Sequence, residues 1–399
     1  MRNPTDAVAI LQDLVRLPSV NPMGRDARGS PYLEHRVTDY LQAFFEQLEV
    51  PWHRQTIAPG RDNIVARLDG RVAGSTLVFE AHQDTVPVEG MTIDPWEPMI
   101  RDNRLHGRGA CDDKGPMASM LTAFSRLARH RPPNMPTVMM ACTVNEENGF
   151  TGAAALARSW AATDHPLLDR LPHAVVVAEP TSLDVVVAHK GVVRWQCHTR
   201  GRAAHGSRPT RGNNAIYSMG PVVTAFQQYA DTLRETGRHP LLGQPTINLG
   251  TIHGGICVNV VPDRCTIELD RRLLPHEDPQ EARTAAINWL TEHLPDNVLD
   301  QLEHDPPFLT NHGLLEHPAS NLATRVQKVA RAAGAPCDQI GVSYATDAPW
   351  FAKLGIPTVV FGPGSINQAH TVDEWIDLDQ LRRAVDVFYT LGSQQTEPA

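Results

Sequence analysis

MPTVMMACTV, residues 135–144, is an unbroken apolar run of strand length, and such a run indicates a strand that is covered on both faces. The segment HAVVVAEP at 173–180 repeats the pattern. Further strands are expected near 62–68 and 75–81, and apolar residues at helical spacing predict helices over 5–16, 32–48 and 115–130. Buried strands separated by helices are typical of an α/β domain with helices on both faces of a central sheet.

The pattern changes after residue 186. GVVRWQCHTRG at 191–201 alternates like a strand with one exposed face. Strand, helix, strand, strand, helix and strand are then expected in order, at 191–201, 213–233, 246–255, 262–273, 278–294 and 298–304. This β-α-β-β-α-β order is the ferredoxin-like unit.

The α/β pattern returns in the last part of the chain, with a helix near 319–333, a strand at 358–362 and a closing helix near 378–392. The simplest account is a catalytic domain in two parts, residues 1–186 and 306–399, that is interrupted by an inserted domain over 187–305. A chain of 399 residues is also too long for one ordinary core, so two domains are expected from length alone.

The composition argues against several classes of protein. Apolar residues make up 41% and charged residues 20% of the chain, which is ordinary for a folded enzyme. The net charge of −9 argues against a nucleic-acid-binding surface, and no window approaches the roughly 18 continuous apolar residues of a membrane span. Six cysteines are scattered without a CxxC pair and the N-terminus shows no signal peptide, so we expect a cytoplasmic protein whose partner is neither nucleic acid nor a membrane.

A histidine and an acid follow the strand predicted at 75–81. In VFEAHQDTVPVEG, residues 78–90, His82 and Asp84 are two positions apart and therefore point to the same side of an extended chain. Such a pair is either a metal ligand with the group that orients it or a solvated polar pair. The motif is too short to decide between these two interpretations.

Four other segments carry similar side chains: the turn GRGACDDKG at 107–115, the two acids of NEENG at 145–149, Glu179 in VVVAEPT, and His370 in FGPGSINQAHTVDE. Taken singly, each has the ordinary interpretation of a solvated loop residue. Taken together, they are expected at the carboxyl ends of the strands, where α/β sheets bind their ligands. Two imidazoles and several carboxylates without a thiolate suit zinc or a harder divalent ion, and the number of oxygen ligands suggests two ions that share one carboxylate.

The order of these motifs resembles that of the di-zinc aminoacylase and exopeptidase family. The matching motifs are HxDTVP, GRGAxDxKG, a Glu pair before Gly, xEPT, GxxAHxxxP, and GPGSINQAH before DE. Members of this family include acetylornithine deacetylase, succinyl-diaminopimelate desuccinylase and carboxypeptidase G. The resemblance runs from LVRLPSVNP at 14–22 to the His370 segment, and the last part, with YATDAP and GPGSINQAH, is most similar to acetylornithine deacetylase.

The resemblance implies a fold and a metal centre. The fold would be a zinc-exopeptidase-like catalytic domain with a mixed central sheet flanked by helices, and the inserted ferredoxin-like α+β domain would be a lid and dimerisation domain. Two zinc ions would be bound, with cobalt or manganese as substitutes. Their five ligands would be His82 and Glu179 on one ion, Glu147 and His370 on the other, and Asp112 between them.

The same resemblance assigns two further residues to the reaction. Asp84 would orient His82 by accepting its second ring N–H. Glu146 would be the general base, which takes a proton from the attacking water and then protonates the leaving amine. The resemblance also implies a cis peptide bond between Asp112 and Asp113.

In the inserted domain, GRAAHGSRP at 201–209 matches the motif GxxAHxxxP, so the resemblance makes His205 a partner of the oxyanion. Asn259 and Arg272 match positions that hold the substrate carboxylate, for which a bidentate arginine is suited. Its neighbour Arg271 is expected to face the opposite way on a strand. The resemblance further implies a homodimer, formed through the inserted domains, in which His205 of one chain serves the zinc site of the other.

The expected function is hydrolysis of the amide bond of an N-acyl amino acid, as in acetylornithine deacetylase. Two alternatives stay open. One is a dipeptidase or carboxypeptidase of the same family that acts on a short peptide. The other is a relative that keeps the fold without turnover, and the intact general base and five intact ligands argue against it.

Overall fold

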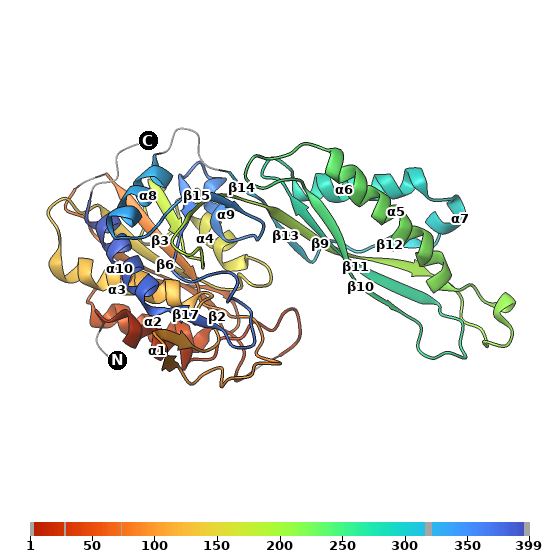
Figure 1. The fold of residues 1–399 in the computed structure, drawn as a ribbon, viewed down its shortest axis with the longest axis horizontal. Helices are drawn as coiled ribbons and strands as arrows, with labels where there is room; N and C mark the ends of the chain where they lie inside the picture. The colour runs from red at the N-terminus through yellow and green to blue at the C-terminus, as the bar shows by residue number, and fades with distance from the viewer. Residues whose placement is uncertain (1–3, 28, 73, 316–320, 395–399) are drawn as a thin grey trace. The chain divides into compact units, whose positions relative to one another are not determined.

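The computed structural model describes residues 4–27, 29–72, 74–315 and 321–394. The chain forms two compact units (Figure 1). The first comprises residues 1–187, 315–340 and 346–399, and the second comprises residues 188–314 and 341–345. Within the described residues, no helix is long and apolar enough to cross a membrane.

A nine-stranded mixed sheet runs through the first unit. Its strands are, in spatial order, β1 (Trp52–Ala58), β2 (Arg61–Leu68), β6 (Thr137–Thr143), β3 (Thr76–His82), β7 (Ala174–Val177), β16 (Thr358–Val360), β8 (Val185–His189) and β14 (Leu314–Leu315), with β15 (Gln339–Val342) paired to β8. β6, β3, β7 and β16 are parallel neighbours, whereas β2 runs antiparallel to β6. The predicted α/β fold with a mixed central sheet is confirmed, and the carboxyl ends of four parallel strands lie at the same end of the sheet.

Helices cover both faces of this sheet. One apolar cluster joins Val138, Met140 and Cys142 of β6 to helices of one face. These helices are α1 (Ala7–Val15), α2 (His35–Gln47), α3 (Lys114–His130), α8 (Leu322–Ala332) and α10 (Leu378–Ser393). The intervening residues of β6 are also buried and point to the opposite face. There α4 (Thr151–Ala161) and α9 (Ala348–Ala352) pack against each other through the rings of Trp160 and Phe351.

Several elements of this unit are not predicted from the sequence, and the longest of them are β1 and α4. β1 is not predicted because it lies at the edge of the sheet and is half-exposed along most of its length, so it carries no apolar run. α4 is not predicted because its buried face is made mostly of alanine and glycine, which leaves only a weak apolar stripe. α8 begins at Leu322, and the predicted start of that helix at 319 lies outside the described residues.

A small sheet carries two segments that bear on the site. It consists of β17 (Trp375–Asp377), β5 (Arg104–His106) and β4 (Met99–Arg101), in that spatial order. Trp375 pairs with His106 in the antiparallel register of β17 and β5. The segment after His370 is thereby joined to the segment that leads into the turn at 107–113.

The second unit has the predicted β-α-β-β-α-β order. Its elements are β9 (Gly191–Arg200), α5 (Ala215–Glu235), β10 (Thr246–Gly254), β11 (Arg264–Leu273), α6 (Pro279–His293), α7 (Asp296–Leu299), β12 (Leu302–His304) and β13 (Leu309–Asn311). The antiparallel sheet has the order β10-β11-β9-β12, and α5 and α6 cover one of its faces around Trp195. The predicted last strand is shorter because its first residues form α7. The unit extends to residue 314, beyond the predicted border at 305, because β13 also pairs with β9.

Candidate metal centre

The parallel strands of the first unit bring three of the predicted segments to one end of the sheet. β3 ends at His82, which is in register with Thr143 at the end of β6. Glu146 and Glu147 follow β6, and Glu179 follows β7 by two residues. Strand register alone therefore gathers an imidazole and three carboxylates at the ligand-binding end of the sheet.

Asp112 lies between two histidines. Its Oδ1 is 3.0 Å from Nε2 of His82, and its Oδ2 is 3.2 Å from Nε2 of His370. A carboxylate that presents one oxygen to each of two imidazoles has the arrangement of a bridging ligand. The peptide bond between Asp112 and Asp113 is cis, as the resemblance implies.

Glu147 belongs to the same cluster. Its Oε2 is 3.3 Å from Nε2 of His370, and one ligand atom from each of His82, Asp112 and Glu147 lies within 4.8 Å of the others. The second oxygen of Glu147, Oε1, is buried and has no hydrogen-bond partner within the described ranges. A divalent cation would give this oxygen a partner, so these side chains fit the metal ions that the sequence predicts.

The electrostatics of the cluster agree with this fit. Burial lowers the pKa of His370, but its hydrogen bonds to Asp112 and Glu147 outweigh this effect and raise the pKa to about 11. Burial raises the pKa of Glu179 well above its usual value, and the negative charges of Asp112 and Glu146 raise it further. Buried carboxylates that repel one another attract positive charge, and a divalent cation would supply it.

Four of the five predicted ligands are therefore linked by side-chain contacts, which run from His82 through Asp112 and His370 to Glu147. Glu179 is buried nearby and acts on the others through its charge, and its side chain makes no hydrogen bond or ion pair in the part of the chain that the structure describes. His370 is the most exposed of the four, with half of its side chain open to solvent.

Asp84 connects two of the ligand segments. Its main-chain oxygen is 3.0 Å from Nδ1 of His82, whereas its Oδ1 is 3.6 Å from that nitrogen, which is too far for a good hydrogen bond. Nδ1 therefore donates to the carbonyl, and Nε2 is left to act as a ligand. The Asp84 carboxylate instead accepts the main-chain N–H groups of Glu146 at 3.1 Å and Glu147 at 3.2 Å. The Asp84 side chain thus positions the predicted base.

Glu146 has the environment of a general base. It is buried, yet its carboxylate makes no hydrogen bond within the described residues. Burial raises the pKa of Glu146 well above its usual value, and the negative charges of Glu147 and Asp347 add to the shift. A carboxylate that has a raised pKa and no competing donor is a stronger base than an ordinary carboxylate, which suits the transfer of a proton to and from a substrate.

Sequence reasoning missed Asn21, which supports this arrangement. Its side-chain NH2 donates to Oδ2 of Asp84 at 2.8 Å and to Oδ1 of Asn145 at 2.9 Å. Asn145 has a φ of 63°, a left-handed conformation in which asparagine is enriched, and its N–H donates to Glu34 at 3.2 Å. The signal was the segment LVRLPSVNP at 14–22, which belongs to the family resemblance and contains Asn21.

In the second unit, His205 and Asn259 lie side by side at one end of the sheet. The N–H of Gly206 donates to the main-chain oxygen of Asn259 at 2.7 Å, and His205 forms a β-bridge with Val260. The N–H of Ser207 donates to Nδ1 of His205 at 3.1 Å. The neutral ring must then carry its proton on Nε2, which makes that exposed nitrogen a donor.

Arg272 lies toward the other end of this sheet. Its Nε and Nη2 are 2.6 and 3.1 Å from the carboxylate of Asp270, which also contacts Nε of Arg194 at 2.7 Å. Two guanidinium groups share one carboxylate, so this group of side chains keeps a net positive charge. Arg271 is buried and pairs with Glu277 at 2.6 Å, which leaves Arg272 as the accessible arginine of the two.

Comparisons with known proteins show the family of this chain. Residues 78–394 match the sequence profile described as peptidase family M20/M25/M40. The acetylornithine deacetylase of Edwardsiella ictaluri is 31% identical to this chain over 381 residues, which is 93% of each protein.

Solved structures share the fold. The M20 family metallo-carboxypeptidase Sso-CP2 of Sulfolobus solfataricus has a TM-score of 0.78 at 17% identity, over 97% of this chain and 98% of that one. The YXEP protein of Bacillus subtilis, described as a dinuclear metal-binding peptidase of the M20 family, has a TM-score of 0.66 at 16% identity, over 98% and 97%. Together with the profile match over most of the sequence, these similarities mean that the chain belongs to peptidase family M20/M25/M40, a family of metal-dependent hydrolases.

Proposed function

We propose that this M20 metallohydrolase cleaves the amide bond of an N-acyl amino acid, in the manner of the acetylornithine deacetylases. The observation that carries the proposal is the position of Asp112, which has one oxygen at each of two imidazoles. The identity of 31% to an acetylornithine deacetylase, along nearly the whole of both chains, supports the N-acyl amino acid as the class of substrate.

The proposed ligands divide between two ions. His82 and Glu179 would hold one ion, Glu147 and His370 would hold the other, and Asp112 would be a ligand of both. Nitrogen and oxygen ligands without a thiolate suit zinc, and cobalt or manganese would substitute for it. When bound, the two ions would polarise the scissile carbonyl and lower the pKa of water.

Glu146 is proposed to move the proton of the reaction. Its carboxylate accepts a proton from the attacking water and then delivers it to the nitrogen of the leaving amine. A carboxyl group of ordinary pKa holds a proton poorly at neutral pH, so the raised pKa of Glu146 suits the second transfer. Asp84 keeps the base in place because it accepts the main-chain N–H of Glu146.

The second unit is proposed to supply the other groups that contact the substrate. Nε2–H of His205 donates to the oxyanion that forms on the acyl carbonyl. Asn259 and Arg272 bind the carboxylate of the amino acid. Two observations support Arg272 in this role. It is the accessible member of the pair Arg271 and Arg272. Because both Arg194 and Arg272 contact the single carboxylate of Asp270, one positive charge is left over to attract a substrate carboxylate.

The separation of these groups along the sheet favours a homodimer. Arg264, at the His205 end of β11, and Arg272 are eight residues apart on that strand, or about 26 Å at the usual rise of a strand. An N-acyl amino acid is far shorter, so one substrate molecule cannot contact both ends of the same sheet. His205 and Asn259 can serve one substrate together with Arg272 only if the two ends of the sheet come from two chains.

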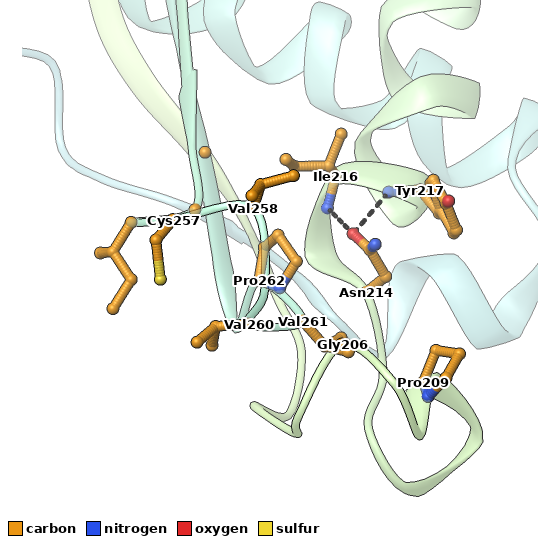
Figure 2. A pocket seen from close by; sticks show the side chains of 13 residues that line it. Gly206, Pro209, Asn214, Ile216, Tyr217, Cys257, Val258, Val260, Val261 and Pro262 are labelled. Carbon is orange, nitrogen blue, oxygen red and sulfur yellow. Dashed lines mark hydrogen bonds between the residues drawn. The ribbon is translucent and has the colours of Figure 1, made fainter.

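An exposed apolar face in the second unit is suited to such a contact. A surface hollow there is lined in part by Ile216, Tyr217 and Val258 (Figure 2). Ile256 also lines it, and Tyr217 is 79% exposed. β10 lies at one edge of this sheet. Apolar side chains beside an open edge suit self-complementary pairing with a second copy of the chain.

Mixing two inactive variants tests the dimer. His205→Ala should lose kcat and keep both metal ions, whereas His82→Ala should lose metal. A heterodimer of these variants has one site that combines an intact metal centre with an intact His205, so the mixture should recover part of the hydrolysis rate.

A second mixture is the control for this experiment. His205→Ala and Asn259→Ala change the same end of the sheet, so their heterodimer has no site with both groups intact, and no recovery is expected. If the first mixture also failed after demonstrated subunit exchange, His205 would act within its own chain or not at all.

A substrate screen tests the proposed reaction. We expect metal-loaded protein to hydrolyse N-acetyl amino acids faster than N-succinyl or N-formyl amino acids and faster than dipeptides. The fold similarity to Sso-CP2 keeps a carboxypeptidase or dipeptidase as the second candidate, and faster release of amino acids from dipeptides would favour it. No hydrolysis of any of these amides would contradict both functions.

A further inference from the structure

A buried ion pair, Arg108–Glu374, lies next to the candidate metal centre and has no role in the proposed reaction. Glu374 is the second residue of the DE pair at 373–374 and lies four residues after His370. Nη1 of Arg108 is 2.7 Å from Oε2 of Glu374, and the two side chains are 4% and 0% exposed. The removal of two charges from water costs free energy, so such a pair persists when further hydrogen bonds satisfy both partners.

Both oxygens of Glu374 bind the turn that carries Asp112. Oε1 accepts the main-chain N–H groups of Cys111 at 2.8 Å and Asp112 at 3.0 Å. Oε2 accepts the N–H of Gly109 at 3.0 Å. Convergent main-chain N–H groups of this kind make a site for an anion, and here the carboxylate of Glu374 occupies it. Glu374 therefore fixes the peptide planes from which the Asp112 side chain projects.

Arg108 extends this connection to two other ligand segments. Its Nη2 donates to the main-chain oxygen of Pro87 at 3.0 Å, in the segment that follows His82. Its Nη1 donates to the main-chain oxygen of Thr371 at 3.3 Å, next to His370. One ion pair thus joins the three segments that carry His82, Asp112 and His370.

We propose that Glu374, paired with Arg108, is a positioning residue that sets the affinity of the metal centre by holding the Asp112 turn against the His370 segment. The inference rests on the ligands proposed above. Metal–ligand distances vary by only about 0.2 Å. Asp112 must also keep one oxygen beside His82 and the other beside His370 at the same time. A small shift of its turn relative to His370 therefore weakens the site, although Glu374 itself touches neither metal nor substrate.

Glu374→Gln tests the proposal, because glutamine has nearly the same shape but lacks the charge and replaces one acceptor oxygen by an NH2 group. Metal-free protein is titrated with Co²⁺, and binding is followed by visible absorption. At least one of the two sites should bind Co²⁺ about 10–100-fold more weakly than in the wild type. At saturating Co²⁺, kcat should return toward the wild-type value, which distinguishes a positioning residue from a catalytic one.

The neighbouring acid provides a matched control. Asp373 is exposed and makes no hydrogen bond or ion pair within the described residues. Asp373→Asn removes the same charge one residue away, so it should bind Co²⁺ as the wild type does. Weakening by both variants to the same extent would mean that charge in this segment, and not the contact with the turn, sets the affinity, which overturns the proposal.

The remaining outcomes separate the proposal from the metal site on which it rests. A folded Glu374→Gln variant that binds Co²⁺ like the wild type overturns the positioning role, whereas wild-type protein that binds no Co²⁺ overturns the metal site itself. If Glu374→Gln does not fold, Arg108→Gln decides, because it leaves the three main-chain N–H bonds to Glu374 in place. Weaker Co²⁺ binding by that variant is expected, and wild-type affinity overturns the proposal.

Discussion

Glu146→Gln should lower kcat by about 10³-fold while both metal ions stay bound. Glutamine keeps the size of the side chain but cannot accept the proton of the attacking water. Metal binding should survive because the Glu146 carboxylate makes no hydrogen bond to a proposed ligand within the described residues. The main-chain N–H that contacts Asp84 is also retained. Steady-state kinetics together with metal analysis of the purified variant checks both parts.

Glu147→Gln is the matched comparison, since it makes the same chemical change at the next residue. Glu147 contacts His370 at 3.3 Å and belongs to the ligand cluster. This variant should therefore bind metal more weakly, and excess metal should restore part of its activity. The opposite result would be loss of metal in Glu146→Gln, and full metal content with a severe loss of kcat in Glu147→Gln. It would mean that Glu147 is the base and Glu146 the ligand.

Removal of metal should abolish turnover and lower the melting temperature. Five proposed ligands with one shared carboxylate make two incomplete coordination shells, so active protein should contain close to two equivalents of metal per chain. Without the ions, buried carboxylates such as Asp112, Glu147 and Glu179 repel one another. Free metal at 100 times its Kd stabilises the folded state by about 2.7 kcal/mol, and chelation removes this contribution.

Thermal unfolding with and without chelator, together with activity after zinc is added back, measures both effects. The expected result is a lower Tm and no turnover in the metal-free protein, with recovery of both on addition of zinc. Full activity of protein that contains no metal would contradict the assignment of His82, Asp112 and their neighbours as ligands.

Local pattern was enough to predict most of the fold. The buried strands β6 and β7 carry unbroken apolar runs, β3 carries a mostly apolar one, and helices such as α10 carry apolar residues at helical spacing. Both signals depend only on neighbouring residues. The apolar run and the helical spacing are both weak where burial depends on a distant partner, as in the edge strand β1 and the alanine-rich helix α4.

The sequence by itself determined which residue types stand at the ends of the parallel strands, and hence a site for divalent metal. It did so because the strands and the motifs that follow them are contiguous in the chain. Only the tertiary structure decided that Asp112 faces both imidazoles while Asp113 accepts the main-chain N–H of His82. Only the tertiary structure joined Arg108 to Glu374, 266 residues further along the chain. Hydrogen bonds and ion pairs of this kind depend on distances between segments remote in sequence, and no local pattern encodes those distances.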